Sequence, residues 1–172
     1  MKITFLLSAF LIVLATSCTP KAYPLKGTYT NGNFEAYSEK SKDAVWDNII
    51  EFFAKNGISI RIIDRSSGLI VSGETELTWS FENKKGELEN KDAWVAIYRL
   101  YDPGSRQTYK PYLVTGEWNI RIKEQNNKTL ININLVNPTY TRVMTSPVKT
   151  TFQKGYVQST GVFEKWVYEK IK

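Results

Sequence analysis

The sequence contains no histidine among its 172 residues. This absence excludes Ser-His-Asp and Cys-His catalytic arrangements, and it excludes zinc sites that depend on imidazole ligands. It also removes the side chain that most often acts as a general base near neutral pH. An enzyme built from this chain would have to use carboxylates, lysine or tyrosine, so the sequence favours a protein that is not an enzyme.

Cysteine is almost as scarce, because Cys18 is the only one in the chain. A single cysteine forms no intramolecular disulfide bond, so the folded domain must be stabilised by its own hydrophobic core. The glycines are scattered singly through turn-like segments, and none forms a phosphate-binding loop. We therefore expect neither a cofactor nor a metal centre.

Positive charge exceeds negative charge, but the cations form no tract. The formal net charge is +6, and the lysines and arginines are interleaved with acidic residues. Nucleic-acid-binding proteins usually concentrate their cations in a patch or stripe. The scattered pattern indicates that nucleic acid is not a partner, and it fits a mild preference for an anionic membrane or an acidic cell wall.

The N-terminus has the pattern of a signal peptide. Lys2 precedes an apolar run of 11 residues at 5–15, and polar residues end this run from Thr16 onwards. A basic start followed by a short apolar stretch is typical of signal peptides, whereas a membrane-spanning helix needs about 20 apolar residues. The alternative is a buried N-terminal helix of the domain, but the run has no helix cap.

The residues before the cysteine resemble a lipobox, the processing site of bacterial lipoproteins. Ala15, Thr16 and Ser17 are small, and Cys18 follows them directly. The resemblance implies a diacylglyceryl group on the Cys18 thiol, cleavage between Ser17 and Cys18, and acylation of the new amino group. An ordinary secretory signal with an incidental cysteine is the alternative. Residues 19–24 contain no acid, which favours an outer-membrane lipoprotein facing the periplasm.

This interpretation divides the chain into a signal peptide at 1–17, a flexible tether at 18–32 and a single domain at 33–172. The clearest helix is predicted at 42–56, with Ser41 as N-cap, Asp43 in the first turn and Gly57 after the end. A hairpin is expected at 58–73, where Ile58, Ile60 and Ile62 alternate with other residues, and another strand is expected at 76–81.

The second half of the domain predicts more strands and a closing helix. The apolar segment 93–98 is typical of a strand covered on both faces. Segments 112–123 and 129–136 alternate between apolar and polar residues, which predicts a hairpin with one buried face. Residues 137–158 are expected to form a long loop with at most one extended piece, and a helix is expected from 159 to the end. The predicted fold class is therefore α+β, an antiparallel sheet with two helices packed on one face.

Two stretches resemble the BamC-like, helix-grip type of envelope lipoprotein domain. They are "SKDAVWDNIIEFFAKNGISIRIIDRSSGLIVSGE" at 41–74 and "STGVFEKWVYEKI" at 159–171. The resemblance implies an α+β domain in the cell envelope that binds or scaffolds other proteins during outer-membrane assembly. It implies no catalytic residue, because the matching residues are mostly those that form the fold.

Candidate interaction residues are the tyrosines that border predicted turns: Tyr101, Tyr109, Tyr112 and Tyr140. A glycosidase uses a pair of carboxylates, and the candidates for such a pair are Glu35, Glu74, Glu76 and Glu117. All four lie on or beside predicted strands, where the solvent-facing side requires polar residues in any case. Asp64 and Arg65 are expected to be solvated turn residues.

Three functions follow from these features. The first is a membrane-anchored lipoprotein that binds envelope proteins. The alternative is a lipoprotein that binds a lipid or a cell-wall fragment between its last helix and its sheet. A carboxylate-based hydrolase is the third and is the least supported by the sequence.

Overall fold

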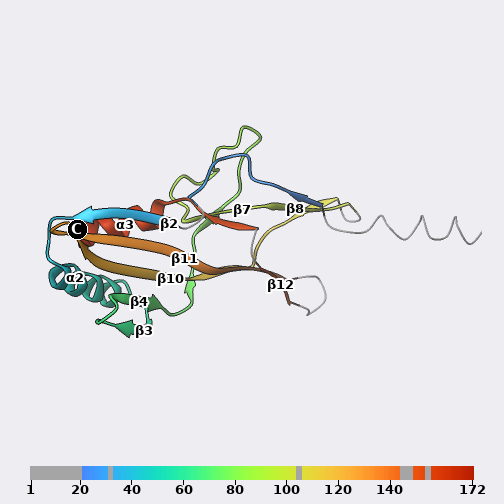
Figure 1. Ribbon diagram of the computed structural model, residues 1–172. Coiled ribbons are helices and arrows are strands. Elements are labelled where there is room, and N and C mark those ends of the chain that lie inside the picture. Colours follow the sequence, from blue (N-terminus) through green and yellow to red (C-terminus); the bar gives the residue numbers. More distant parts are fainter. Residues whose placement is uncertain (1–20, 31–32, 104–105, 144–148, 154–155) are drawn as a thin grey trace, which may run out of the picture.

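The computed structural model describes residues 21–30, 33–103, 106–143, 149–153 and 156–172. These residues form an α+β fold of mostly antiparallel strands with two helices (Figure 1), and the predicted fold class is confirmed at that level. The central sheet has seven strands: β2 (Asn33–Ser38), β3 (Ile60–Asp64), β4 (Leu69–Ser72), β5 (Thr75–Glu76), β10 (Leu113–Gln125), β11 (Lys128–Val143) and β12 (Lys149–Gln153).

Two small sheets lie beside the central sheet. One pairs β1 (Lys21–Tyr23), β8 (Arg99–Asp102) and β9 (Gln107–Tyr109) in the order β1-β8-β9. The other pairs β13 (Val157–Ser159), β7 (Val95–Ile97) and β6 (Trp79–Ser80), and its β6–β7 pairing is parallel. β8 and β12 lie at the end of the molecule away from α2 (Lys42–Lys55) (Figure 1).

The β10–β11 hairpin forms the centre of the main sheet, as its alternating sequence predicts. Ile120 pairs with Ile133 and Ile122 with Ile131, and all four side chains are buried on the same face. The turn residues Asn126 and Asn127 have φ of 54° and 60°. Positive φ at both central residues of a two-residue loop matches the right-handed twist of the strands, and asparagine tolerates it well.

The helix α2 is confirmed almost to the residue. The Ser41 hydroxyl accepts a hydrogen bond from the Ala44 N–H, and Asp43 lies in the first turn. The helix ends at Lys55, and Gly57 follows with φ of 65°. The helix buries five apolar residues at helical spacing: Val45, Trp46, Ile49, Phe52 and Phe53.

The second helix, α3 (Val162–Ile171), fills the space against the sheet. The Phe163 ring stacks on the Trp118 indole with 3.8 Å between ring centroids, and both residues are fully buried. α2 and α3 contact each other as well as β11, and Asn48 of α2 donates a hydrogen bond to the Ile171 carbonyl. The interface between α3 and the sheet is therefore packed core, not the ligand groove that the sequence suggested.

Two strand predictions were only partly right. The hairpin expected at 58–73 forms, but its alternating isoleucines do not mark a buried face, because Ile62 is 42% exposed and Ile63 is 56% exposed. A register shift between Ile60 and Ile62 and the position of β3 at the sheet edge account for this. The single strand expected at 76–81 is divided into β5 and β6, which pair with β10 and β7 in different sheets.

The predicted loop at 137–158 is wrong for the residues that the structure describes there. β11 continues to Val143, and β12 and β13 follow. Asn137 has φ of 49° and the register shifts opposite Gly116, so Asn137 and Pro138 form a bulge instead of a strand end. Proline is tolerated at bulges, so Pro138 does not end the strand.

The tether predicted at 18–32 is also wrong for residues 21–30. Lys21, Ala22 and Tyr23 pair in register with Tyr101, Leu100 and Arg99. This strand packs onto the domain because Ala22 contacts the core beside the buried Leu100. Local composition, with its prolines and glycine, gave no sign of this long-range pairing.

The stacking of Phe163 on Trp118 allows a prediction about the stability of the fold. Phe163→Ala should lower the free energy of unfolding by about 3–5 kcal/mol, because it removes a fully buried ring and leaves a cavity against Trp118. Urea unfolding of the variant and the wild type measures the difference. Tyr112→Ala is the control, since Tyr112 is 68% exposed and its loss should change stability by about 0.5 kcal/mol or less. Equal effects of the two substitutions would contradict this packing.

Candidate functional site

The carboxylate of Glu82 lies at the centre of the best-defined polar cluster. Glu82 is 8% exposed, and its Oε2 accepts a 2.7 Å hydrogen bond from the Lys26 N–H. Its Oε1 accepts from the Gly27 N–H at 2.8 Å and from the Tyr29 hydroxyl at 2.5 Å. We call residues 24–29 the N-terminal strap, because this carboxylate holds them across a domain surface formed by residues more than fifty positions later.

The strap passes close to Glu82, and glycine makes this approach possible. A Cβ atom at Gly27 would lie 2.8 Å from Glu82 Oε1 and 3.0 Å from the Tyr29 hydroxyl. Real Cβ atoms do not approach another heavy atom to 2.8 Å, so a side chain at this position would require the strap or the Glu82 carboxylate to shift. Gly27 is needed here because the backbone lies against Glu82.

The hydrogen bonds determine the charge state of this cluster. Burial opposes ionisation of Glu82, but the hydrogen bonds from the Lys26 N–H, the Tyr29 hydroxyl and the Gly27 N–H outweigh burial and lower the pKa of Glu82. Burial and the adjacent carboxylate raise the pKa of Tyr29. At neutral pH the cluster therefore holds an ionised Glu82 and a protonated Tyr29.

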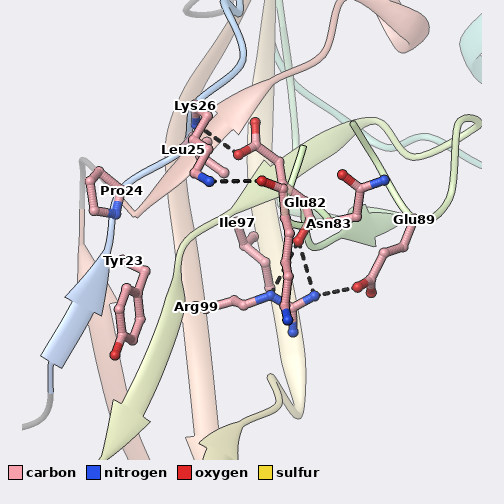
Figure 2. Close-up of a pocket in the computed structure, with 10 residues that line it drawn as sticks. Tyr23, Pro24, Leu25, Lys26, Glu82, Asn83, Glu89, Ile97 and Arg99 are labelled. Atoms are coloured by element: carbon pink, nitrogen blue, oxygen red, sulfur yellow. Dashed lines mark hydrogen bonds and ion pairs between the residues drawn. The ribbon is translucent and has the colours of Figure 1, made fainter. Parts of the chain in front are cut away.

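Arg99 of β8 also binds to this cluster, through the backbone of Glu82. Its Nε and Nη2 donate to the Glu82 carbonyl at 3.2 and 3.0 Å, and Nη2 also pairs with the Glu89 carboxylate (Figure 2). The guanidinium lies 4.4 Å from the centroid of the Phe81 ring. Arg99 thus links β8, which pairs with β1, to the backbone of the residue that binds the strap.

A cavity of about 520 Å³ opens beside these residues. The strap and β1 provide one wall, and β7, β8 and the segment after β6 provide the other (Figure 2). Its lining is mixed in character: Tyr23, Pro24, Leu25, Lys26, Glu82, Asn83, Lys84, Glu89, Ile97 and Arg99. Lys26 donates a 2.8 Å hydrogen bond to the Lys84 carbonyl across it. Apolar walls with a few charged groups of both signs suit a small amphipathic ligand.

The predicted tyrosine surface does not form as a unit. Tyr140 is fully buried, and its hydroxyl donates to the Tyr109 carbonyl, so its assignment to the surface is wrong. Tyr109 packs against the core and donates to Asp102. Tyr101 makes an edge contact with Tyr23, and Tyr112 is exposed. The turn-like sequence around Tyr140 hid the continuation of β11, which turns this side chain inwards.

The candidate carboxylates each have a polar neighbour on or beside the sheet. Glu35 accepts from Asn132, Glu74 accepts from Thr115, and Glu117 pairs with Arg61 at 2.6 Å. Glu76 is exposed at its pairing position opposite Thr115. These contacts are those of structural polar side chains.

The turn at Asp64 behaves as the sequence suggests. Asp64 accepts hydrogen bonds from the Ser66 hydroxyl and from the Ser67 and Ser66 N–H groups, and these bonds lower its pKa to about 2. Arg65 is exposed and pairs with Asp43 at 2.9 Å. Both residues close a hairpin and join it to α2.

Sequence reasoning missed two buried acids, Glu82 and Glu164. Glu164 is fully buried in the first turn of α3, where Ser159 donates a hydrogen bond to its Oε1, and burial raises its pKa. Oε2 of Glu164 has no hydrogen-bond partner among the described residues. No local pattern marked either acid, because each is buried by residues from other segments.

Cys18 and Ser17, the expected lipidation and cleavage residues, lie outside the described residues. Within the described part of the chain, no three His, Cys, Asp or Glu residues are grouped to hold a metal ion. No helix in that part is long and apolar enough to cross a membrane. No known protein family matches this sequence, and no curated protein matches it either.

Glu82 makes a testable prediction about the strap. Glu82→Gln replaces one acceptor oxygen by an amide that cannot accept, so part of the strap should detach and its local opening should become easier by about 1–3 kcal/mol at pH 7. Amide exchange at Lys26 and Gly27, followed by NMR, measures this opening. Glu89→Gln is the matched control, because Glu89 contacts Arg99 and not the strap.

The wild type should show the same loss on acidification. Because the folded pKa of Glu82 is lowered, its stabilising contribution is present above the unfolded value of about 4.3 and is lost as pH falls through the folded value. Protection at Lys26 and Gly27 should therefore fall at acid pH in the wild type and change little with pH in Glu82→Gln. A wild-type strap whose protection falls no more on acidification than that of Glu82→Gln would contradict the role of the carboxylate.

Proposed function

We propose that this chain is a lipid-anchored protein of the bacterial cell envelope whose domain binds other envelope proteins without catalysing a reaction. Three features support the anchor: the apolar run at 5–15, the small residues before Cys18, and the polar residues that follow. The α+β fold, with α2 and α3 together against the central sheet, is compatible with the BamC-like, helix-grip type of domain. That resemblance and the acid-free segment after Cys18 favour the periplasmic side of the outer membrane.

The observation that carries the binding role is the exposed edge at β3. Successive side chains of a strand point to opposite faces, so one of two neighbours normally packs on the core. In β3 both Ile62 and Ile63 are exposed, at 42% and 56%. Within the described chain, β3 pairs with β4 on one side and with no strand on the other. The edge thus has an exposed isoleucine on each face, between Arg61 and Asp64, and it has backbone groups available for pairing.

An extended segment of another envelope protein fits this edge. Adding a strand beside β3 would pair its outer backbone groups, and apolar side chains of the added strand would cover both isoleucines. Proteins usually protect such edges with charges or prolines, and leaving two isoleucines exposed carries an aggregation risk. We infer that the edge is kept for a partner, and that the domain acts as a scaffold through strand addition.

A second candidate function is binding of a small lipid or cell-wall fragment. The cavity of about 520 Å³ beside the strap favours it, because that volume suits a small ligand and its lining combines apolar walls with charged groups of both signs. This site replaces the groove between the last helix and the sheet, which is filled by Phe163 and Trp118.

The anchor predicts a specific chemical change on substitution of the cysteine. Cys18→Ser in the full chain should abolish the acylated N-terminal peptide, because serine provides no thiol for diacylglyceryl transfer. The measurement is mass spectrometry of the digested protein together with fractionation of the cells. Stable attachment needs more than one acyl chain, so the variant should also lose the tight membrane association of the mature lipoprotein. An unmodified N-terminus in the wild type would refute the anchor.

The β3 edge predicts selective loss of partners. Ile63→Lys should weaken capture of an envelope protein by about tenfold or more, because it places a charge where apolar area would be buried. Quantitative affinity capture with the full-length protein from solubilised envelopes measures this. Tyr37→Lys is the control, since Tyr37 is 48% exposed on β2, at the opposite edge of the same sheet. A set of captured proteins that is the same for both variants and the wild type would count against strand addition and favour the small-ligand function.

A further inference from the structure

The first described strand begins very close to the proposed lipid anchor. Only Thr19 and Pro20 separate Cys18 from Lys21, the first residue of β1. Three residue steps span at most about 11 Å whatever path the chain takes. This limit places the start of β1 within about 11 Å of an acylated Cys18. The following argument rests on the acylation of Cys18 proposed above.

β1 is fixed to the rest of the domain, so an anchor close to β1 also holds the domain close to the membrane. It pairs with β8 over its whole length, and the strap that follows is held by the Glu82 carboxylate. The sheet formed by β1, β8 and β9 must therefore lie at the membrane surface whenever Cys18 is inserted by its acyl chains. A domain on a long flexible tether would have no such constraint.

The strand register separates the two faces of this small sheet. Ala22, Leu100 and Tyr109 are opposite one another and face the core. Lys21 is opposite Tyr101, which is opposite Thr108, so these residues lie on the other face together with Tyr23. Lys21 and Thr108 are exposed, and Tyr23 is 45% exposed. The Lys21 ammonium lies 5.5 Å from the Tyr23 ring centroid. Arg99 is opposite Tyr23 and shares this side of the sheet. We call this set, Lys21, Tyr23, Arg99, Tyr101 and Thr108, the outer face.

The charges around the outer face are predominantly positive. Arg106 and Lys110 are exposed immediately before and after β9, and Lys21 begins β1. Among the residues that the structure describes, none of these three cations belongs to an ion pair. The acid of this sheet, Asp102, lies on the inner side and accepts a hydrogen bond from Tyr109. Glu89 is paired with Arg99.

We propose that the outer face of the β1-β8-β9 sheet docks on the anionic phospholipid headgroups of the membrane that holds Cys18. Lys21, Arg106 and Lys110 attract phosphate groups, and each cation near such a surface strengthens binding about fivefold. The tyrosines suit the same location, because their rings are apolar and their hydroxyls are polar, as in the aromatic belts of membrane proteins. The domain then lies in one orientation on the bilayer, with β3 at an edge of the central sheet that lies apart from the small sheet (Figure 1).

Hydrogen–deuterium exchange of the full acylated chain in vesicles tests this contact. The vesicles contain either equal parts of phosphatidylcholine and phosphatidylglycerol or phosphatidylcholine alone. Peptides that cover β8 and β9 should exchange more slowly in the anionic vesicles, whereas peptides that cover β3 should not change. Arg106→Gln and Lys110→Gln should each reduce the added protection about fivefold. Lys123→Gln is the matched control, because Lys123 is an exposed cation near the far turn of the β10–β11 hairpin.

Failure of the docking can be distinguished from failure of the anchor. Mass spectrometry of the same digest reports whether Cys18 carries acyl groups. An acylated protein whose β8 and β9 exchange equally fast in both kinds of vesicle would overturn the docking and leave the anchor intact. Equal effects of Lys110→Gln and Lys123→Gln would overturn it as well. A protein without acyl groups would instead refute the anchor, and with it the basis for docking.

Discussion

The β10–β11 hairpin is the element on which the rest of the fold depends. Its two strands contribute pairing edges for β2, β12, β4 and β5, so almost all of the central sheet is assembled on it. Its buried face also carries Trp118, on which Phe163 of α3 stacks. Without the regular alternation of apolar and polar residues along this hairpin, neither helix would have a surface to pack against. The two-asparagine turn sets the register in which the strands pair.

A second constraint, the Glu82 carboxylate, joins the N-terminal segment to this core. The carboxylate accepts hydrogen bonds from two backbone N–H groups and one hydroxyl. These bonds offset the free-energy cost of burying an ionised side chain. The strap converts a segment that resembles a linker into a fixed part of the domain. This matters for the proposed function, because the same segment leads directly to Cys18. A lipid anchor joined to a fixed strand determines how the domain is oriented, whereas one joined to a flexible linker determines only where it is.

The proposed binding surfaces lie on different sheets and suit different partners. The β3 edge has exposed isoleucines and an open backbone edge, which suit a protein strand. The outer face of β1-β8-β9 has tyrosines and cations, which suit anionic lipid. The cavity beside the strap lies next to the second surface and shares Tyr23 with it. A domain docked through one sheet would present the edge of the other to proteins in the same compartment, which is the arrangement that a scaffold requires.

The sequence alone predicted the elements whose signals are local. The capped helix α2 and the β10–β11 hairpin were confirmed because caps, turns and hydrophobic periods depend on residues close together in the chain. Cys18 remains the residue for which the sequence predicts a chemical modification. Tertiary structure decided what depends on distant segments: the burial of Tyr140 and Glu164, the strands after Asn137, the exposure of Ile63, and the strap on Glu82. Gly27 and Glu82 are 55 positions apart, and only the packed fold brings a backbone N–H to a buried carboxylate over such a separation.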